Sequence, residues 1–178
     1  MSAGHTSAAK DDSQLRQKEM IATHFDKLSK AQETGQKVVY TFVPGNLTEL
    51  LTCLDLLPVL PEINALQSGM RGKSRDYINV AEKLGHSEDV CTYVKCDVGM
   101  LHSGNVGPTG ERLPRPDLLL LSYTGCFTFL KWFEMLGQEY QKPVAMLQSG
   151  SFRSISSPAS CSRMNRSNGL SWLKLLMT

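Results

Sequence analysis

Four consecutive leucines, Leu118–Leu121, constrain the fold of this chain more than any other feature. The run is too apolar for a strand with one solvated face, and Pro116 and Gly125 bound it, so it predicts a strand buried on both faces. After the turn at Gly125 comes Cys126, followed by the apolar spacing of a helix. A thiol at the carboxyl end of a buried parallel strand, beside a helix N-terminus, lies where open α/β sheets bind ligands. Cys126 is therefore the first candidate site residue.

Strand and helix patterns alternate on both sides of this run. Further strands are expected at 37–42, at 143–148 and, on a sheet edge because it contains a proline, at 57–60. Helices are expected at 13–31, 47–56, 64–70, 74–84, 87–100 with Ser87 as cap, and 127–140, and a surface loop is expected at 104–116. This alternation predicts an α/β fold: an open parallel sheet with flanking helices, of the flavodoxin or Rossmann kind.

Composition divides the chain into three parts. Residues 1–12 are small and polar and predict a disordered N-terminus, whereas residues 13–148 form the α/β domain. Residues 149–178 are an anomalous serine- and arginine-containing tail with four basic residues and no acidic one. Residues 1–148 carry 15 basic against 17 acidic residues, so the net charge of +2 comes from the tail. We therefore expect no nucleic-acid partner.

The chain shows no signal for a membrane or for secretion. It contains no apolar run of about 18 residues, which a spanning helix needs. The N-terminus lacks the apolar segment of a secretory signal. We therefore expect a cytoplasmic protein, in which cysteines are more often free, catalytic or metal-bound than paired in disulfides.

Two of the five cysteines occupy predicted helix starts. Cys91 and Cys126 lie where the positive end of a helix dipole suits an anionic iron–sulfur cluster. The residues alone leave two interpretations open, a shared metal or cluster and two unrelated core thiols. Cys96 is five positions after Cys91 and points to another side of the helix, so we expect it to be a buried thiol. We expect the same of Cys53.

Ionisable side chains precede Cys91. His86, Glu88 and Asp89 form a polar group just before it. Such groups can transfer protons near a cluster or substrate, but the pattern alone favours a solvated helix start, where acidic residues are favourable. His86 and Glu88 are the candidates for proton handling.

Longer motifs carry a resemblance to a known family. They are VVYTFVPGNLTELL (38–51), LPEINALQSGMR (60–71), GHSEDVCTYVKCDVG (85–99) and PDLLLLSYTGCFTFLKWFE (116–134). With them, residues 14–148 closely resemble the cluster-bearing subunits of ATP-dependent benzoyl-CoA reductases, in the 2-hydroxyacyl-CoA dehydratase superfamily.

The resemblance implies a function and a set of partners. In such enzymes two homologous subunits hold 4Fe-4S clusters near the CoA-ester site, and separate ATPase subunits deliver electrons from ferredoxin. Benzoyl-CoA is reduced to a cyclohexadiene carbonyl-CoA in anaerobic aromatic degradation. On the matching motifs, Cys91 and Cys126 are expected to ligate iron, and Cys96 is not. ATP is expected to act only through the partner subunits.

The resemblance stops after Gln148. Family members continue with a second α/β domain, which supplies a third cysteine ligand and much of the substrate cleft. Here the chain continues as SGSFRSISSPASCS, a composition that a frame shift or chimeric gene fragment would produce. Cys161 matches no ligand motif. The resemblance therefore implies the first domain of a larger fold, which alone binds iron poorly and is inactive.

Two other functions remain open. The first is a subunit of a 2-hydroxyacyl-CoA dehydratase, which uses similar clusters to eliminate water. The second is a non-enzymatic, flavodoxin-like binding module, in which the thiols are only part of the core. In that case Cys91→Ser and Cys126→Ser would leave a colourless and equally stable protein.

Overall fold

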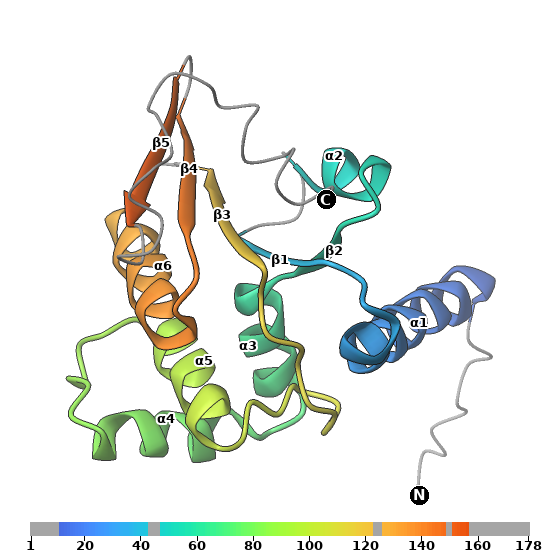
Figure 1. Ribbon diagram of the computed structural model, residues 1–178. Helices are drawn as coiled ribbons and strands as arrows, with labels where there is room; N and C mark the ends of the chain where they lie inside the picture. The colour runs from blue at the N-terminus through green and yellow to red at the C-terminus, as the bar shows by residue number, and fades with distance from the viewer. Residues whose placement is uncertain (1–10, 43–46, 123–125, 149–150, 157–178) are drawn as a thin grey trace, which may run out of the picture.

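A computed structural model describes residues 11–42, 47–122, 126–148 and 151–156 (Figure 1). Its helices are α1 (Asp12–Thr34), α2 (Thr48–Cys53), α3 (Pro61–Met70), α4 (Ser74–Lys83), α5 (Thr92–His102) and α6 (Phe127–Tyr140). Its strands are β1 (Val38–Thr41), β2 (Leu57–Val59), β3 (Leu118–Ser122), β4 (Val144–Gln148) and β5 (Ser151–Ser156). The predicted α/β class is confirmed. Most of the stretch predicted to be disordered, 1–12, and residues 157–178 of the tail lie outside the described residues.

The described strands form one open sheet in the order β2-β1-β3-β4-β5. β1 is parallel to both β2 and β3, and β3 is parallel to β4. β2, which contains Pro58, lies at the edge as predicted. β5 pairs antiparallel with β4 and was not among the strands that the sequence predicts. The serine-rich sequence gives no apolar period, but pairing with β4 uses main-chain groups that every non-proline residue carries.

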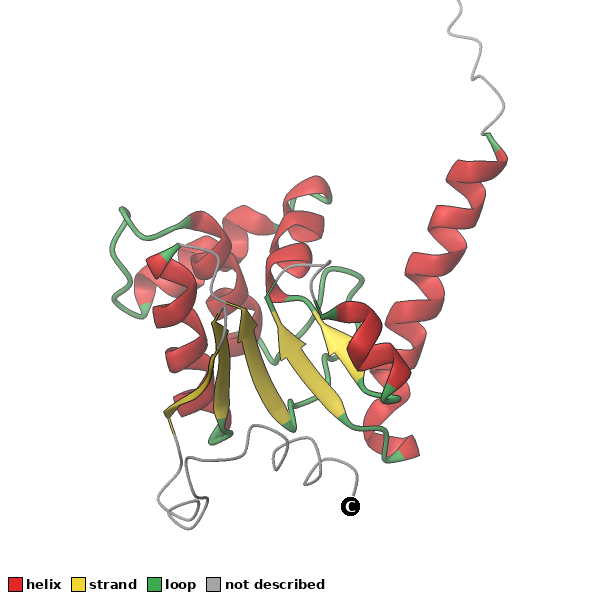
Figure 2. Ribbon diagram, turned by 90° about the horizontal axis from the view of Figure 1, so that it is seen from above, coloured by secondary structure: helices red, strands yellow, loops and turns green. Residues whose placement is uncertain are grey.

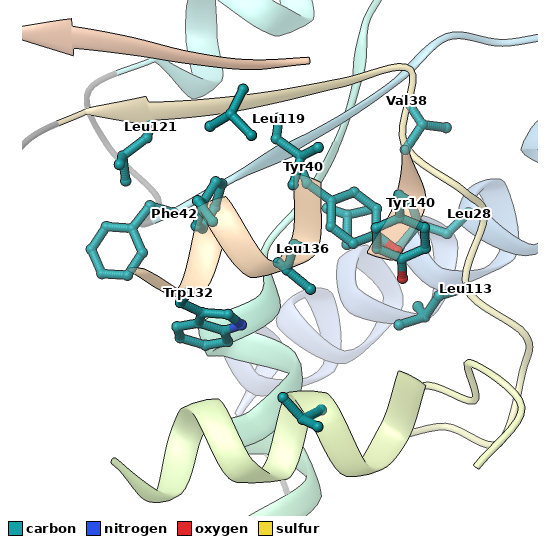
Figure 3. Close-up of a cluster of buried hydrophobic side chains, with 14 of the residues drawn as sticks. Leu28, Val38, Tyr40, Phe42, Leu113, Leu119, Leu121, Trp132, Leu136 and Tyr140 are labelled. Atoms are coloured by element: carbon teal, nitrogen blue, oxygen red, sulfur yellow. The ribbon is translucent and has the colours of Figure 1, made fainter. Parts of the chain in front are cut away.

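The central strand β3 is buried on both faces, as its leucines predict. Each of Leu118–Leu121 is at most 6% exposed. Leu119 and Leu121 face the cluster that contains the core residues of α6 (Figure 3). Leu118 and Leu120 face the opposite cluster, which contains the buried residue of α2. Burying side chains on alternate faces stabilises the sheet by about 1.5–3 kcal/mol per leucine.

Helices cover the two faces of the sheet unequally. α1, α5 and α6 contribute to the core on one face, and Figure 2 shows most of the helices gathered on one side of the strands. Among the described helices, α2 packs on the other face through Leu51. None of the described helices has the length and apolar character that a membrane crossing requires.

The start of α5 differs from the prediction. Ser87 is not the helix cap, because Cys91 is the N-cap residue. Ser87 instead closes a turn, in which its Oγ accepts from the Asp89 N–H at 3.3 Å and its carbonyl accepts from the Val90 N–H at 3.1 Å. Helical bonding begins with the Lys95 N–H, which donates to the Cys91 carbonyl at 3.1 Å.

The predicted surface loop at 104–116 is partly buried. Leu113 is 5% exposed and belongs to the main core cluster. The Tyr40 hydroxyl, buried in that core, donates to the Pro114 carbonyl at 2.9 Å. The loop therefore supplies an apolar side chain and an acceptor to the core, which its glycines and prolines did not predict.

Candidate metal centre at two helix N-termini

Cys91 and Cys126 occupy equivalent positions in the fold. Each is the N-cap residue of a helix, Cys91 of α5 and Cys126 of α6. Both side chains are exposed and neither is in a disulfide. Neither helix has a side-chain hydrogen bond at its cap, and in α6 the Phe129 N–H donates to the Cys126 carbonyl at 3.2 Å. Free thiols beside the positive ends of two helices suit an anionic metal cluster.

α5 and α6 run in the same direction and are joined by one hydrogen bond, and a second bond joins the turn after α5 to the end of α6. The Trp132 Nε1–H donates to Asp97 Oδ2 at 2.8 Å, and the Tyr140 hydroxyl donates to Asn105 Oδ1 at 3.1 Å. Both pairs join residues 35 positions apart. Figure 3 shows α6 passing Trp132, Leu136 and Tyr140 in a direction opposite to β3, as in an α/β unit.

The two cysteines follow the same register. Cys91 and Cys126 are also 35 positions apart, and each lies six residues before the Asp97–Trp132 pair. The two N-caps therefore have the same sequence offset from this hydrogen bond, and Cys126 follows the carboxyl end of β3. No third histidine, cysteine or acidic residue within the described ranges completes a metal-binding group. A cluster at this place would need its further ligands from outside the described residues.

A buried lysine anchors the segment that precedes Cys91. The side chain of Lys95 is 4% exposed, and its ammonium group donates to Glu82 Oε1 and to the Glu88 carbonyl, both at 2.8 Å. This contact ties the turn before Cys91 to α4 and α5. Sequence reasoning missed Lys95, because a lysine within an apolar helix gives no sign of whether its partner is water or a buried carboxylate.

Replacing Lys95 by methionine is expected to loosen this turn. The substitution keeps an unbranched side chain but removes both hydrogen bonds, and a lost bond to a charged group costs about 1.5–3 kcal/mol. Amide hydrogen exchange in residues 87–91 should accelerate by about tenfold or more. Lys131→Met is the matched control, because the Lys131–Glu134 pair is exposed and contributes little. Equal exchange in the two variants would contradict the anchoring role.

His86 and Glu88 lie in this anchored turn. His86 is half-buried and its main-chain N–H closes α4 on the Ala81 carbonyl at 3.1 Å, whereas Glu88 is exposed. Within the described part of the chain neither side chain has a hydrogen bond or an ion pair. Both precede Cys91 on the same turn and remain candidates for proton handling.

Of the other two cysteines that the structure describes, one is buried as predicted and one is exposed. Cys96 is 2% exposed, its Sγ lies 3.9 Å from the Ala65 carbonyl, and burial followed by the charge of Asp97 raises its pKa to about 11. Its prediction as a core thiol is confirmed. Cys53 is exposed, so the prediction that it is a core residue is wrong. The short helix α2 buries Leu51, and Cys53 points away. Cys161 lies outside the described residues.

Asp97 is the buried acid of this region, and sequence reasoning missed it. It is 6% exposed, and burial raises its pKa to about 7 even though the hydrogen bond from Trp132 lowers it. Trp132 and Phe133 are 1% and 0% exposed and belong to the core. An aspartate inside the apolar stretch VKCDVGML was the available signal, because such a residue needs a buried partner.

Comparison with known proteins finds relatives that are named as subunits of reductases or dehydratases of CoA esters. The chain is 60% identical over 139 residues to a benzoyl-CoA reductase subunit of Thauera aromatica, a match that covers 78% of this chain and 32% of that protein. It is 29% identical over 133 residues to the (R)-2-hydroxyisocaproyl-CoA dehydratase alpha subunit of Clostridioides difficile, covering 74% and 31%. It is 27% identical over 117 residues to the (R)-phenyllactyl-CoA dehydratase alpha subunit of Clostridium sporogenes, covering 66% and 28%.

The matches cover only part of each relative, and one of them reaches past Gln148 in this chain. The chain spans about a third of the length of each of these relatives. A family model, 2-hydroxyglutaryl-CoA dehydratase D-component, matches residues 41–164, so it extends beyond Gln148 into the tail. The match covers most of the chain and includes both candidate cysteines. The chain therefore belongs to the 2-hydroxyglutaryl-CoA dehydratase D-component family.

Proposed function

We propose that this chain is the N-terminal part of a cluster-bearing subunit of an ATP-driven benzoyl-CoA reductase. The observation that carries the proposal is the 60% identity to the Thauera aromatica reductase subunit, about twice the identity to the dehydratase subunits. The chain would serve in the reduction of benzoyl-CoA to a cyclohexadiene carbonyl-CoA.

The proposed cofactor is a 4Fe-4S cluster with Cys91 and Cys126 as two of its ligands. The arrangement of these residues supports this, because two free, exposed thiols lie at the N-caps of two helices that a hydrogen bond joins six residues further on. A bound cluster would supply single electrons of low potential. A third protein ligand would come from outside the described residues.

The roles of the neighbouring residues follow from their positions. Lys95 would keep the turn before Cys91 in place, because it binds the Glu88 carbonyl. His86 and Glu88 would exchange protons with the substrate side, since they lie on that turn without side-chain partners among the described residues. The amides at the N-terminus of α6 could donate to charge that develops on the thioester carbonyl.

The proposed partners are those of a multi-subunit enzyme. They are a homologous cluster-bearing subunit, ATPase subunits that receive electrons from ferredoxin, and the CoA ester. The name of the Thauera aromatica relative as a reductase subunit supports an assembly of this kind. We propose a cytoplasmic location.

A dehydratase subunit is the second candidate. The matching family model and two relatives carry dehydratase names, and a dehydratase would use the same thiols to hold a cluster for water elimination. The non-enzymatic binding module remains a third candidate, in which neither thiol binds iron.

A pair of chimeric enzymes would distinguish these functions. Residues 14–148 would replace the corresponding part of the Thauera aromatica reductase subunit and, in parallel, of the 2-hydroxyisocaproyl-CoA dehydratase alpha subunit. We expect ATP-dependent benzoyl-CoA reduction from the first chimera with its partner subunits, and little dehydration from the second. Loss of reduction in the first chimera on Cys126→Ser, but not on Cys53→Ser, would support the ligand role.

Three other results would count against the proposed function. Activity in the dehydratase chimera alone would favour the second candidate. If both chimeras assemble with their partners and bind iron but neither is active, the segment does not perform either reaction. If Cys91→Ser and Cys126→Ser leave iron content and activity unchanged, the cluster proposal is wrong.

A further inference from the structure

A polar pair interrupts the apolar interface between α5 and α6. Asp97 and Trp132 are 6% and 1% exposed, and the neighbouring core side chains, Val94, Val98 and Phe133, are apolar. The only hydrogen bond that the Asp97 carboxylate makes in the described part of the chain comes from the Trp132 indole, at 2.8 Å. Burying an acid with a single donor is unfavourable compared with an apolar side chain of similar size. Stability alone therefore does not explain this pair.

The position of the pair suggests a different role. Asp97 and Trp132 each lie six residues beyond a cysteine N-cap, about 9 Å along the helix axis. Apolar contacts are not directional, so the valines and Phe133 permit small shifts of one helix along the other. A hydrogen bond between two buried side chains has a fixed length and direction.

We propose that the Asp97–Trp132 hydrogen bond sets the register of α5 against α6 and thereby holds Cys91 and Cys126 level. Asp97 and Trp132 are positioning residues for the two thiols. The part of this inference that concerns iron rests on the proposed function, but the register itself does not.

The second hydrogen bond between these segments cannot replace the first. The Tyr140–Asn105 pair lies eight residues further on, at the last residue of α6 and three residues beyond the end of α5. It restrains the ends remote from the cysteines. A shift by one residue at the other end would move a thiol by about 1.5 Å and turn it by about 100° around its helix. Such a change would misplace one of two ligands.

The first test measures the register without iron. Spin labels on Cys91 and Cys126 in the full chain, with Cys53→Ser and Cys161→Ser as background, give the distance distribution by pulsed electron paramagnetic resonance. Cys96 stays unlabelled because it is buried. We expect Asp97→Leu to shift or broaden the distribution on the order of one helical rise, about 1.5 Å. Asp97→Asn should retain the wild-type distribution, because its amide oxygen accepts the indole N–H.

Two variants separate positioning from general damage to the core. Asp97→Leu removes the buried acid, so it should melt at or above the wild-type temperature even though the register loosens. Tyr140→Phe is the control, because it removes the part-buried hydrogen bond to Asn105 and the 3.5 Å contact with the Tyr40 hydroxyl at the end of α6 remote from the cysteines. It should leave the distance between the labels unchanged. Trp132→Phe should behave like Asp97→Leu in distance, but with lower stability.

The second test adds iron and sulfide under anaerobic conditions to the unlabelled chain. Asp97→Leu should lower iron affinity by about tenfold or more, as loss of residues that orient ligands does, and Tyr140→Phe should not. Wild-type distances in both Asp97→Leu and Trp132→Phe would overturn the inference. So would equal distance changes in Asp97→Leu and Tyr140→Phe. A wild-type chain that binds no iron would contradict the proposed function and leave the distances to decide the register.

Discussion

Replacing Gly99 by alanine is expected to destabilise the chain by about 3 kcal/mol or more, an effect large enough to unfold many domains of this size. Gly99 lies where α5 crosses α4. A Cβ at this position would lie 2.6 Å from Tyr77 Cα and would also overlap the Tyr77 carbonyl group, both part of the main chain of α4. A main chain cannot rotate away as a side chain can, so the two helices must separate. Chemical denaturation followed by circular dichroism measures the loss.

Gly69→Ala is the matched control for this substitution. Gly69 lies in α3, is exposed, and a Cβ there would meet no atom closer than Ser74 Oγ at 4.0 Å. Alanine is favoured over glycine in helices by up to about 1 kcal/mol, so this variant should be slightly more stable than the wild type. Equal stability of the two variants would show that α4 and α5 are not in such close contact.

The second large effect is a dependence of stability on pH that arises from Asp97. Its pKa is about 7 in the folded chain and about 3.8 for an ordinary aspartate, because burial disfavours the charged form. Between these values the folded state holds the proton more tightly than the unfolded state, so stability falls as pH rises. The loss begins near pH 4 and is complete above pH 7. It amounts to on the order of 4 kcal/mol.

Comparison with Asp97→Asn isolates this effect. The unfolding free energy of the wild type minus that of the variant should decrease from pH 4 to pH 8. Burial also raises the pKa of the neighbouring Cys96, Tyr40 and Tyr140, so these groups stay neutral through this range. Urea titrations at several pH values supply the measurement. A difference that does not change with pH would show that the pKa of Asp97 is the same in the folded and unfolded states.

The fold was predictable where the sequence contains an apolar run, an apolar period or a residue such as proline that restricts a strand. The apolar run of leucines predicted that β3 is a buried central strand, and Pro58 predicted that β2 is an edge strand because proline has no N–H to donate. β5 was not predicted, since its pairing depends on β4 and not on its own pattern. The burial of Leu113 depends likewise on the distant residues around Tyr40.

The candidate site was predictable in part for the same reason. Cys91 and Cys126 were placed at helix starts from local pattern, and the structure confirms both positions. The cap at Ser87 was wrong because a serine turn competes with a serine cap for the same nearby amides. Lys95 and Asp97 were missed, since their roles depend on partners 13 and 35 residues away. Long-range partners of single polar residues leave no mark in a local pattern.

The most direct test of the central claim is the iron content of the chain after anaerobic reconstitution with iron, sulfide and an excess of a small thiol, which can fill the coordination positions that Cys91 and Cys126 do not occupy. Wild type and Cys53→Ser, in which another exposed thiol is removed, should bind iron to the same extent and show the visible absorbance of a cluster. The double variant Cys91→Ser/Cys126→Ser should bind almost none. Wild-type iron content and absorbance in the double variant would contradict the claim that these two helix N-termini hold the cluster.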